Sequence, residues 1–118
     1  MKKDNAVLDK SFRFAIRVIR LYQHLIDSKK EFVLSKQMLR SGTSIGANVR
    51  EADNAESKAD FIHKLGIAQK ETDETMYWLE LLKETDYLIG HEFDSIHQDA
   101  NELLKLIRSI IITSKNNR

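Results

Sequence analysis

Two aspartate–histidine pairs at three-residue spacing are the residues whose types best suit metal chemistry in this sequence. They are Asp60 with His63 and Asp94 with His97. Helical bundles that hold two iron or manganese ions use two Glu-x-x-His pairs, plus a glutamate from each of two other helices, all pointing inwards. Here the acid is aspartate, both pairs lie where helices are expected to begin, and His63 faces away from the apolar side of its helix. We therefore predict no metal site.

The residues of the common catalytic motifs are missing. The 118 residues include no cysteine, no glycine-rich phosphate loop and no His-Glu-x-x-His motif. The serines, histidines and acids have no spacing that would bring a catalytic set together. We predict that the chain is not an enzyme and that it binds no cofactor or small-molecule ligand. The lack of cysteine also excludes disulfides and suits a reducing compartment.

Five basic residues fall on one side of the first expected helix and are called the basic row here: Lys10, Arg13, Arg17, Arg20 and His24. Cations at this spacing line up along a helix, as binding to a phosphate backbone requires. The row predicts weak RNA binding without base stacking, because no aromatic residues are interleaved with it. The alternative is a solvated face whose cations pair with acidic neighbours, and the net charge of only +1 favours it.

A second group of polar residues borders the apolar side of the second expected helix and is called the polar row: Gln37, Ser41, Ser44, Asn48 and Glu51. A buried polar group without a partner costs about 1–3 kcal/mol, so we expect these side chains to be paired. Lys64 and Glu71 of the third helix are the expected partners. Three interpretations stay open: a hydrogen-bond network that fixes helix register, a ligand site, or an exposed row.

Apolar residues recur at helical spacing along the whole chain and predict four helices, at residues 5–27, 31–54, 57–86 and 92–114. There is no proline, and the four glycines are too few for a fold with many tight turns. Ser57 and Asp60 resemble a capping box that starts the third helix, and Gly90 is expected to act as a helix stop. Short connections favour antiparallel neighbours. The predicted fold is all-α, an antiparallel up-down-up-down four-helix bundle with one domain over residues 1–118.

Gly42 permits another interpretation, in which residues 34–46 form a helix-turn-helix with the turn at this glycine. The second helix would then need apolar residues where Asn48 and Glu51 stand, so a continuous helix is favoured. The longest apolar run, Ile110 to Ile112, is too short to cross a membrane. The first residues lack the apolar stretch of a signal peptide, and the expected location is the cytoplasm.

The first helix is apolar over more of its circumference than one core-facing stripe requires. One apolar sector is centred on Phe12, Ile16 and Ile19. The second sector is the candidate oligomer interface and includes Phe14, Val18, Leu21 and Leu25. Either the helix is deeply buried in its own bundle, or this second sector contacts another subunit.

Three stretches of the sequence carry a family resemblance. They are Gln37-x-x-x-Ser41-x-x-Ser44-Ile45-x-x-Asn48-Val49-x-Glu51, then Ser57-x-x-Asp60-Phe61-x-x-Lys64-Leu65, and then Trp78-Leu79-x-Leu81-Leu82. This pattern resembles the four-helix-bundle proteins encoded in intervening sequences of bacterial 23S rRNA genes. The resemblance implies a bundle that assembles into a homo-oligomer, with a ring of five subunits favoured. It implies no active site.

The accessory proteins of diversity-generating retroelements are similar in fold to that family, and they work with nucleic acid and a reverse transcriptase. They are strongly basic, whereas this chain is nearly neutral. Two classes of function therefore stay open for this chain. One is a non-catalytic, oligomeric RNA-associated protein, and the other is an oligomeric scaffold that binds proteins and no nucleic acid.

Overall fold

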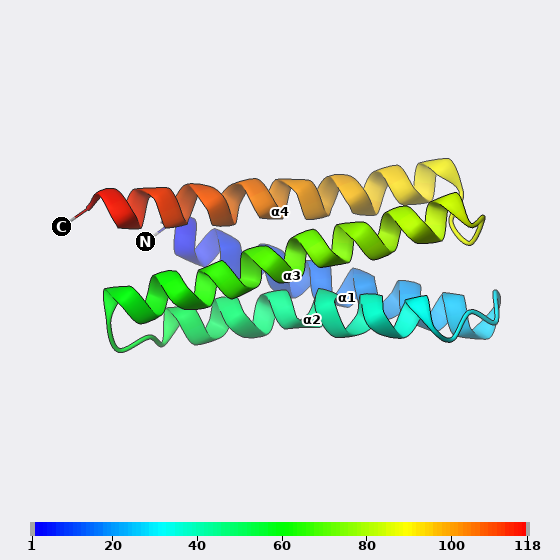
Figure 1. Cartoon of the computed structure of the whole chain (residues 1–118), viewed down its shortest axis with the longest axis horizontal. Coiled ribbons are helices and arrows are strands. Elements are labelled where there is room, and N and C mark those ends of the chain that lie inside the picture. The colour runs from blue at the N-terminus through cyan, green and yellow to red at the C-terminus, as the bar shows by residue number, and fades with distance from the viewer. Residues whose placement is uncertain (1, 118) are drawn as a thin grey trace.

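Four long helices run side by side in alternating directions (Figure 1). The computed structural model describes the backbone of residues 2–117 and the side chains of residues 6–117. The helices are α1 (Lys2–Asp27), α2 (Leu34–Asp53), α3 (Lys58–Glu84) and α4 (Gly90–Asn116). Each helix packs on the next one, and α4 packs back on α1, in a rod of 49 × 21 × 19 Å. The predicted all-α up-down bundle is confirmed. None of the helices described is both long and apolar enough to span a membrane.

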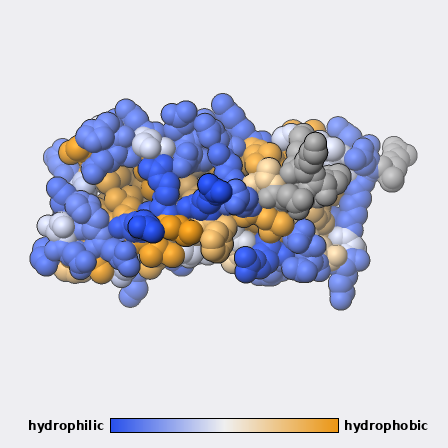
Figure 2. Space-filling view, turned by 180° about the vertical axis from the view of Figure 1, so that it is seen from behind, coloured by the Kyte–Doolittle hydropathy of each residue, from blue (hydrophilic) through white to orange (hydrophobic). Residues whose placement is uncertain are grey.

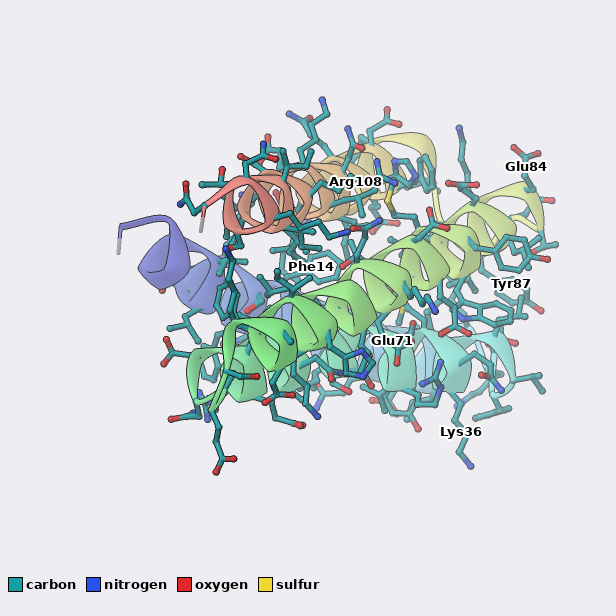
Figure 3. The ribbon with its side chains drawn as sticks, turned by 60° about the vertical axis from the view of Figure 1, so that its left-hand side comes forward. Phe14, Lys36, Glu71, Glu84, Tyr87 and Arg108 are labelled. Atoms are coloured by element: carbon teal, nitrogen blue, oxygen red, sulfur yellow. The ribbon has the colours of Figure 1, made fainter. Side chains whose placement is uncertain are left out.

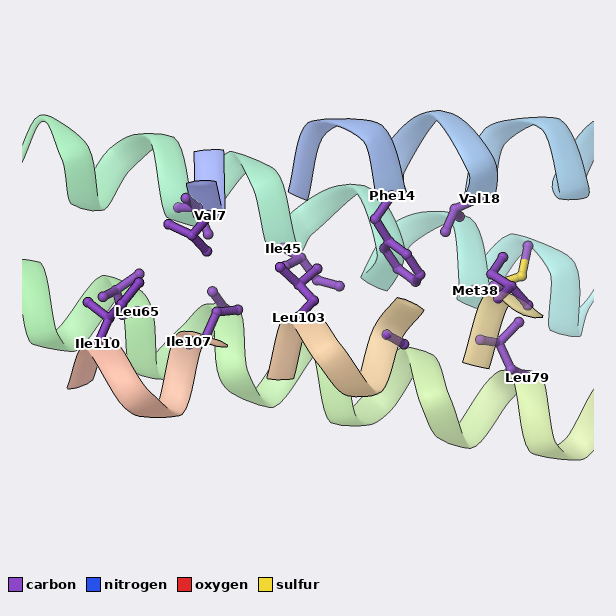
Figure 4. Close-up of a cluster of buried hydrophobic side chains, with 14 of the residues drawn as sticks. Val7, Phe14, Val18, Met38, Ile45, Leu65, Leu79, Leu103, Ile107 and Ile110 are labelled. Atoms are coloured by element: carbon purple, nitrogen blue, oxygen red, sulfur yellow. The ribbon is translucent and has the colours of Figure 1, made fainter. Parts of the chain in front are cut away.

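The core is built from aliphatic side chains in layers along the rod (Figure 4). Val7, Leu65 and Ile110 lie towards one end, and Ile45 and Leu103 occupy the middle. All five are at most 3% exposed. Complete burial of a side chain of this size contributes about 1.5–3 kcal/mol. The helical spacing of these residues in the sequence is therefore what selects the bundle.

The two apolar sectors of α1 are reversed relative to the interpretation in which the second sector contacts another subunit. Phe14 is 2% exposed, and Val18 and Leu25 are completely buried within the single chain. Leu21 is half-buried and packs against the same core. The prediction that this sector contacts another subunit is wrong for Phe14, Val18 and Leu25, because the single chain already buries them. The physical reason is Gly42 of α2, whose missing side chain lets the Val18 side of α1 come close.

The ends of the helices can be compared with the start and stop signals predicted from the sequence. Ser57 caps α3 as predicted, since its hydroxyl accepts a hydrogen bond from the backbone N–H of Asp60 at 3.0 Å. Gly90 begins α4 instead of stopping a helix. The left-handed residue after α3 is Asp86, with φ 70°. Because α2 is continuous through Gly42, the helix-turn-helix interpretation is also wrong.

Candidate interaction surfaces

Acidic residues neutralise three members of the basic row. The Nζ of Lys10 lies 3.0 Å from Glu102 of α4, and an Nη of Arg17 lies 2.7 Å from Asp99 of the same helix. Arg13 pairs with Asp9 one turn earlier on α1, also at 3.0 Å. The pKa of Glu102 is lowered, mainly by the hydrogen bond from Lys10. These cations therefore form the paired, solvated face that was the alternative to RNA binding.

Arg20 and His24 are the members of the basic row for which the structure shows no ion pair among the described residues. Both side chains are exposed and border a groove of about 310 Å³, which we call the α1–α4 groove. Aliphatic side chains form its floor, and Arg17 and Glu92 complete its rim. The floor consists of Leu21, Leu88 and Ile96. The groove thus combines an apolar base with cations along one wall.

The polar row is joined to α3 at two points. Glu51 forms an ion pair with Lys64 at 2.9 Å, as the sequence predicted, and the hydrogen bond from Lys64 to Glu51 raises the lysine pKa. Ser41 is fully buried and meets the hydroxyl of Thr75 across the helix interface. These two contacts link α2 to α3, as a hydrogen-bond network that fixes helix register would require.

The rest of the polar row does not reach α3. Ser44 donates to the carbonyl of Arg40, and Asn48 donates to the carbonyl of Ser44, both within α2. Gln37 is exposed. Glu71 lies on the side of α3 that faces α2 (Figure 3). It is bound by the guanidinium of Arg40, with Nη1 3.1 Å from Oε2, and not by a member of the row. Arg40 also binds Glu74. The hydrogen bond to Glu71 raises the arginine pKa.

A buried carboxylate at the start of α2 was missed by the sequence analysis. Glu31 accepts hydrogen bonds from the backbone N–H groups of Val33, Leu34 and Ser35, at 2.7 to 3.2 Å. Burial alone would raise its pKa, but these hydrogen bonds lower it below its ordinary value. Because its side chain caps the helix from outside, α2 begins at Leu34 and not at Glu31. The signal available in the sequence was an acid shortly before an apolar periodic stretch.

The two aspartate–histidine pairs lie in the first turns of α3 and α4, which begin at opposite ends of the bundle (Figure 1). His97 lies 2.9 Å from Glu80 of α3 and stacks on Phe93, whereas Asp94 and His63 are exposed. Within the described part of the chain, no three histidine, aspartate or glutamate side chains are grouped so that they could hold a metal ion. His97 therefore has a structural partner in Glu80.

The side of α1 that faces away from the core is apolar. Phe12 is 56% exposed, Ile16 37% and Ile19 40%. Beside Phe12, a groove of about 360 Å³ separates α1 from α2, with Gly46 and Ala47 in its lining. The view from behind shows several hydrophobic patches near the middle of the molecule, with hydrophilic residues between and around them (Figure 2). We call Phe12, Ile16 and Ile19 the apolar face of α1.

Comparison with known proteins decides the family. The profile described as "23S rRNA-intervening sequence protein" matches residues 3–109. The chain belongs to this family. Among solved structures, it is similar to the crystal structure of a protein with unknown function from the S23 ribosomal protein family of Bacteroides thetaiotaomicron VPI-5482. The two chains are 59% identical with a TM-score of 0.91, over 92% of this chain and 97% of the other. No match is found among curated proteins.

For this 23S rRNA-intervening sequence family protein, the comparisons establish the family and a related fold, but they assign no function. The related structure is itself described as having unknown function, and neither comparison names an activity. The matched segment contains most of α1, together with the basic row, the polar row and the apolar face. The surfaces described above therefore belong to the family domain.

Proposed function

We propose that the protein acts as a non-catalytic, self-associating helical bundle that presents binding surfaces in an oligomer. The observation that carries this proposal is the apolar face of α1, where three large hydrophobic side chains are 37 to 56% exposed on one side of one helix. Scattered exposed apolar residues need no explanation, but a contiguous set marks an interaction site.

The groove beside this face suits contact with another helix. Ala15, Gly46 and Ala47 line it with small side chains, so a second backbone can come close to α1 and α2. Removal of apolar surface from water contributes about 25 cal/mol per Å². Burial of Phe12, Ile16 and Ile19 would therefore favour association. A ring of five subunits is the stoichiometry that we propose from the family resemblance.

Light scattering coupled to size exclusion, at micromolar protein concentration, tests self-association. We expect a wild-type mass several times that of one 13.7 kDa chain. Ile16→Glu and Ile19→Glu should shift the mass towards the monomer, because each places an unpaired charge in an apolar contact. Ile112→Glu is the matched control, since Ile112 is 60% exposed on α4. A monomeric wild-type protein would refute the proposal.

RNA binding is the second candidate function, and the observation that favours it is the pair Arg20 and His24. The structure shows no acid paired with either side chain in its described part. An oligomer would repeat the pair in every subunit, so that weak phosphate contacts add through avidity. Since the other three cations are already neutralised, the expected affinity is low and depends strongly on salt.

Fluorescence anisotropy with a structured RNA at low and moderate salt tests this function. Arg20→Glu should abolish binding, whereas Arg13→Glu should reduce it less because Arg13 is paired with Asp9. If wild type and Arg20→Glu bound RNA with equal affinity, the basic row of α1 would take no part in RNA recognition. Absence of binding at low salt would leave the protein-binding scaffold as the function.

A further inference from the structure

We propose that one end of the bundle contacts the surface of an anionic lipid bilayer, into which two connecting segments insert apolar side chains. The inserted residues are Phe32, Val33 and Ile89, which we call the apolar tip. The contact is peripheral and uses no residue of the apolar face of α1. It therefore goes beyond the proposed function and does not depend on it.

The apolar tip is formed by the two connections that lie at the same end of the rod (Figure 1). The α1–α2 connection carries Phe32 and Val33, which are 60% and 69% exposed, and the α3–α4 connection carries Ile89, which is 52% exposed. The connection at the opposite end, residues 54–57, has only small or polar side chains. Since connections normally consist of polar and turn-forming residues, an apolar end indicates an interaction site.

The α1–α2 connection holds its two apolar side chains outwards in a defined shape. The chain turns at Lys30, which has φ 55°. The backbone N–H of Glu31 donates to the carbonyl of Leu25 at 3.0 Å, and the Glu31 carboxylate accepts from the N–H of Val33 at 3.2 Å. Glu31 is thus buried, while the next two side chains face solvent. An anchor that is already ordered loses less conformational entropy when it binds.

Ile89 is held at the start of α4 in a similar way. Its N–H donates to the carboxylate of Glu92 at 3.5 Å, and its carbonyl accepts from the N–H of Phe93 at 3.0 Å. The preceding residue, Leu88, is buried in the core. With Leu88 directed inwards and the helix beginning directly after it, Ile89 stays on the outside of the tip.

Lysines flank the apolar pair of the α1–α2 connection. Lys29, Lys30 and Lys36 are exposed, and the structure shows no ion pair for any of them within residues 6–117. Asp27 is the exposed acid of this stretch, because the carboxylate of Glu31 is bound by backbone N–H groups. Lysine stems can lie along apolar surface while the ammonium groups reach lipid phosphates. Three such cations favour an anionic bilayer.

The α3–α4 connection differs in charge and sets the orientation of the contact. Glu84 and Asp86 are exposed there. Lys36 on α2 and Glu84 on α3 project to opposite sides near this end of the bundle (Figure 3). The acids would be repelled by anionic headgroups. We therefore expect the rod to stand on its end and tilt towards the α1–α2 connection, so that Phe32 and Val33 enter more deeply than Ile89.

The narrow end of the rod suits a bilayer better than a protein partner. The bundle measures 21 × 19 Å across. A standard protein interface takes about 800 Å² from each partner, so a contact confined to this end is small for a stable protein complex. A bilayer sets no such minimum, because its affinity grows with each apolar side chain that enters it.

Flotation with lipid vesicles tests the contact, using phosphatidylcholine alone and an equal mixture with phosphatidylglycerol. We expect the wild type to float with the mixed vesicles and less with phosphatidylcholine alone. Phe32→Ser/Val33→Ser should lower the partition coefficient about tenfold, because the affinity follows the apolar area inserted. Ile112→Ser is the matched control, since Ile112 is 60% exposed near the other end of the rod, and it should stay within about twofold of wild type. Lys29→Gln/Lys30→Gln should remove the preference for the mixed vesicles.

A fluorescent label tests the orientation, since the sequence has no cysteine to interfere. Val33→Cys carrying a polarity-sensitive thiol dye should shift its emission to shorter wavelength when mixed vesicles are added. Ile112→Cys with the same dye should not shift. An equal shift at both positions would show that the rod lies flat on the bilayer, which overturns a contact through the tip.

The remaining outcomes separate lipid from other occupants of the tip. A wild type that floats with neither kind of vesicle would refute the proposal and leave a protein as the partner of the tip. Flotation of Phe32→Ser/Val33→Ser equal to that of wild type would refute it as well. Light scattering without lipid measures self-association separately. A lower mass for Phe32→Ser/Val33→Ser would assign the tip to a contact between copies instead, whereas a monomeric wild type that still floats would refute the proposed self-association alone.

Discussion

The hydroxyl of Thr75 donates a hydrogen bond to the hydroxyl of Ser41 over 2.8 Å, inside the interface between α2 and α3. Both residues are completely buried. Each hydroxyl also lies near a carbonyl of its own helix, Met38 O at 3.3 Å for Ser41 and Glu71 O at 2.7 Å for Thr75. Neither hydroxyl loses every partner when the other is removed. The pair therefore helps to set the register of α2 against α3, and the loss of either hydroxyl should destabilise the bundle only modestly.

A double-mutant cycle on Ser41→Ala and Thr75→Val should measure that contribution. We expect each single substitution to lower the free energy of unfolding by about 1 kcal/mol, with a coupling of about 0.5–1.5 kcal/mol between them. Urea unfolding followed by circular dichroism gives the four values. Strictly additive losses would mean that the two hydroxyls do not interact in solution.

Gly42→Ala should destabilise the bundle by about 1–3 kcal/mol. A Cβ at this position would lie 2.7 Å from Cγ1 and 2.8 Å from Cγ2 of Val18, which is itself completely buried. The matched control is Gly66→Ala in α3, where an added Cβ meets nothing within 4 Å. That control should gain about 0.5–1 kcal/mol from helix propensity. Thermal unfolding of both variants checks the opposite signs, and a stabilised Gly42→Ala would contradict the packing.

Glu31→Ala should cost about 0.5–2 kcal/mol, because α2 loses the carboxylate that accepts from three backbone N–H groups. The pH dependence follows from the lowered pKa of Glu31. Its stabilisation is complete above the ordinary glutamate pKa of about 4.3 and is lost as the pH falls through the lower folded-state value. Urea midpoints measured from about pH 3 to about pH 7 should therefore fall less steeply with acid in Glu31→Gln than in wild type. Parallel curves would show that Glu31 does not contribute to the acid sensitivity.

The sequence predicted the fold and several local contacts because those depend on neighbours along the chain. The helical spacing of Ile45, Val49 and Ala52 defines a core side without knowledge of the partner helix. The Ser57 cap is equally local, since donor and acceptor are three residues apart. Lys64 was predicted as a partner of the polar row from its place on α3, and it pairs with Glu51. Glu71 was predicted on the same ground but is bound by Arg40.

The outward surface could not be predicted in the same way, because it depends on which helix packs where. A wheel shows that α1 has two apolar sectors but not which of them meets Gly42. It also places Arg17 in the basic row without showing that α4 brings Asp99 to within 2.7 Å. The ion pairs of the basic row and the reversal of the two apolar sectors of α1 both depend on how the helices pack against one another.

Paired substitutions on α1 test that reversal directly. Phe14→Ala removes a ring that is 2% exposed and should cost about 3–5 kcal/mol of unfolding free energy through the cavity it leaves. Phe12→Ala removes a ring that is 56% exposed, so the stability of one subunit should change by no more than about 0.5 kcal/mol. The two variants are compared by chemical denaturation at a concentration low enough to keep the chain monomeric, and by sedimentation at high concentration. Phe12→Ala should weaken self-association while leaving monomer stability intact, because Phe12 belongs to the apolar face of α1. A larger loss of monomer stability from Phe12→Ala than from Phe14→Ala would mean that the first sector, and not the second, faces the core.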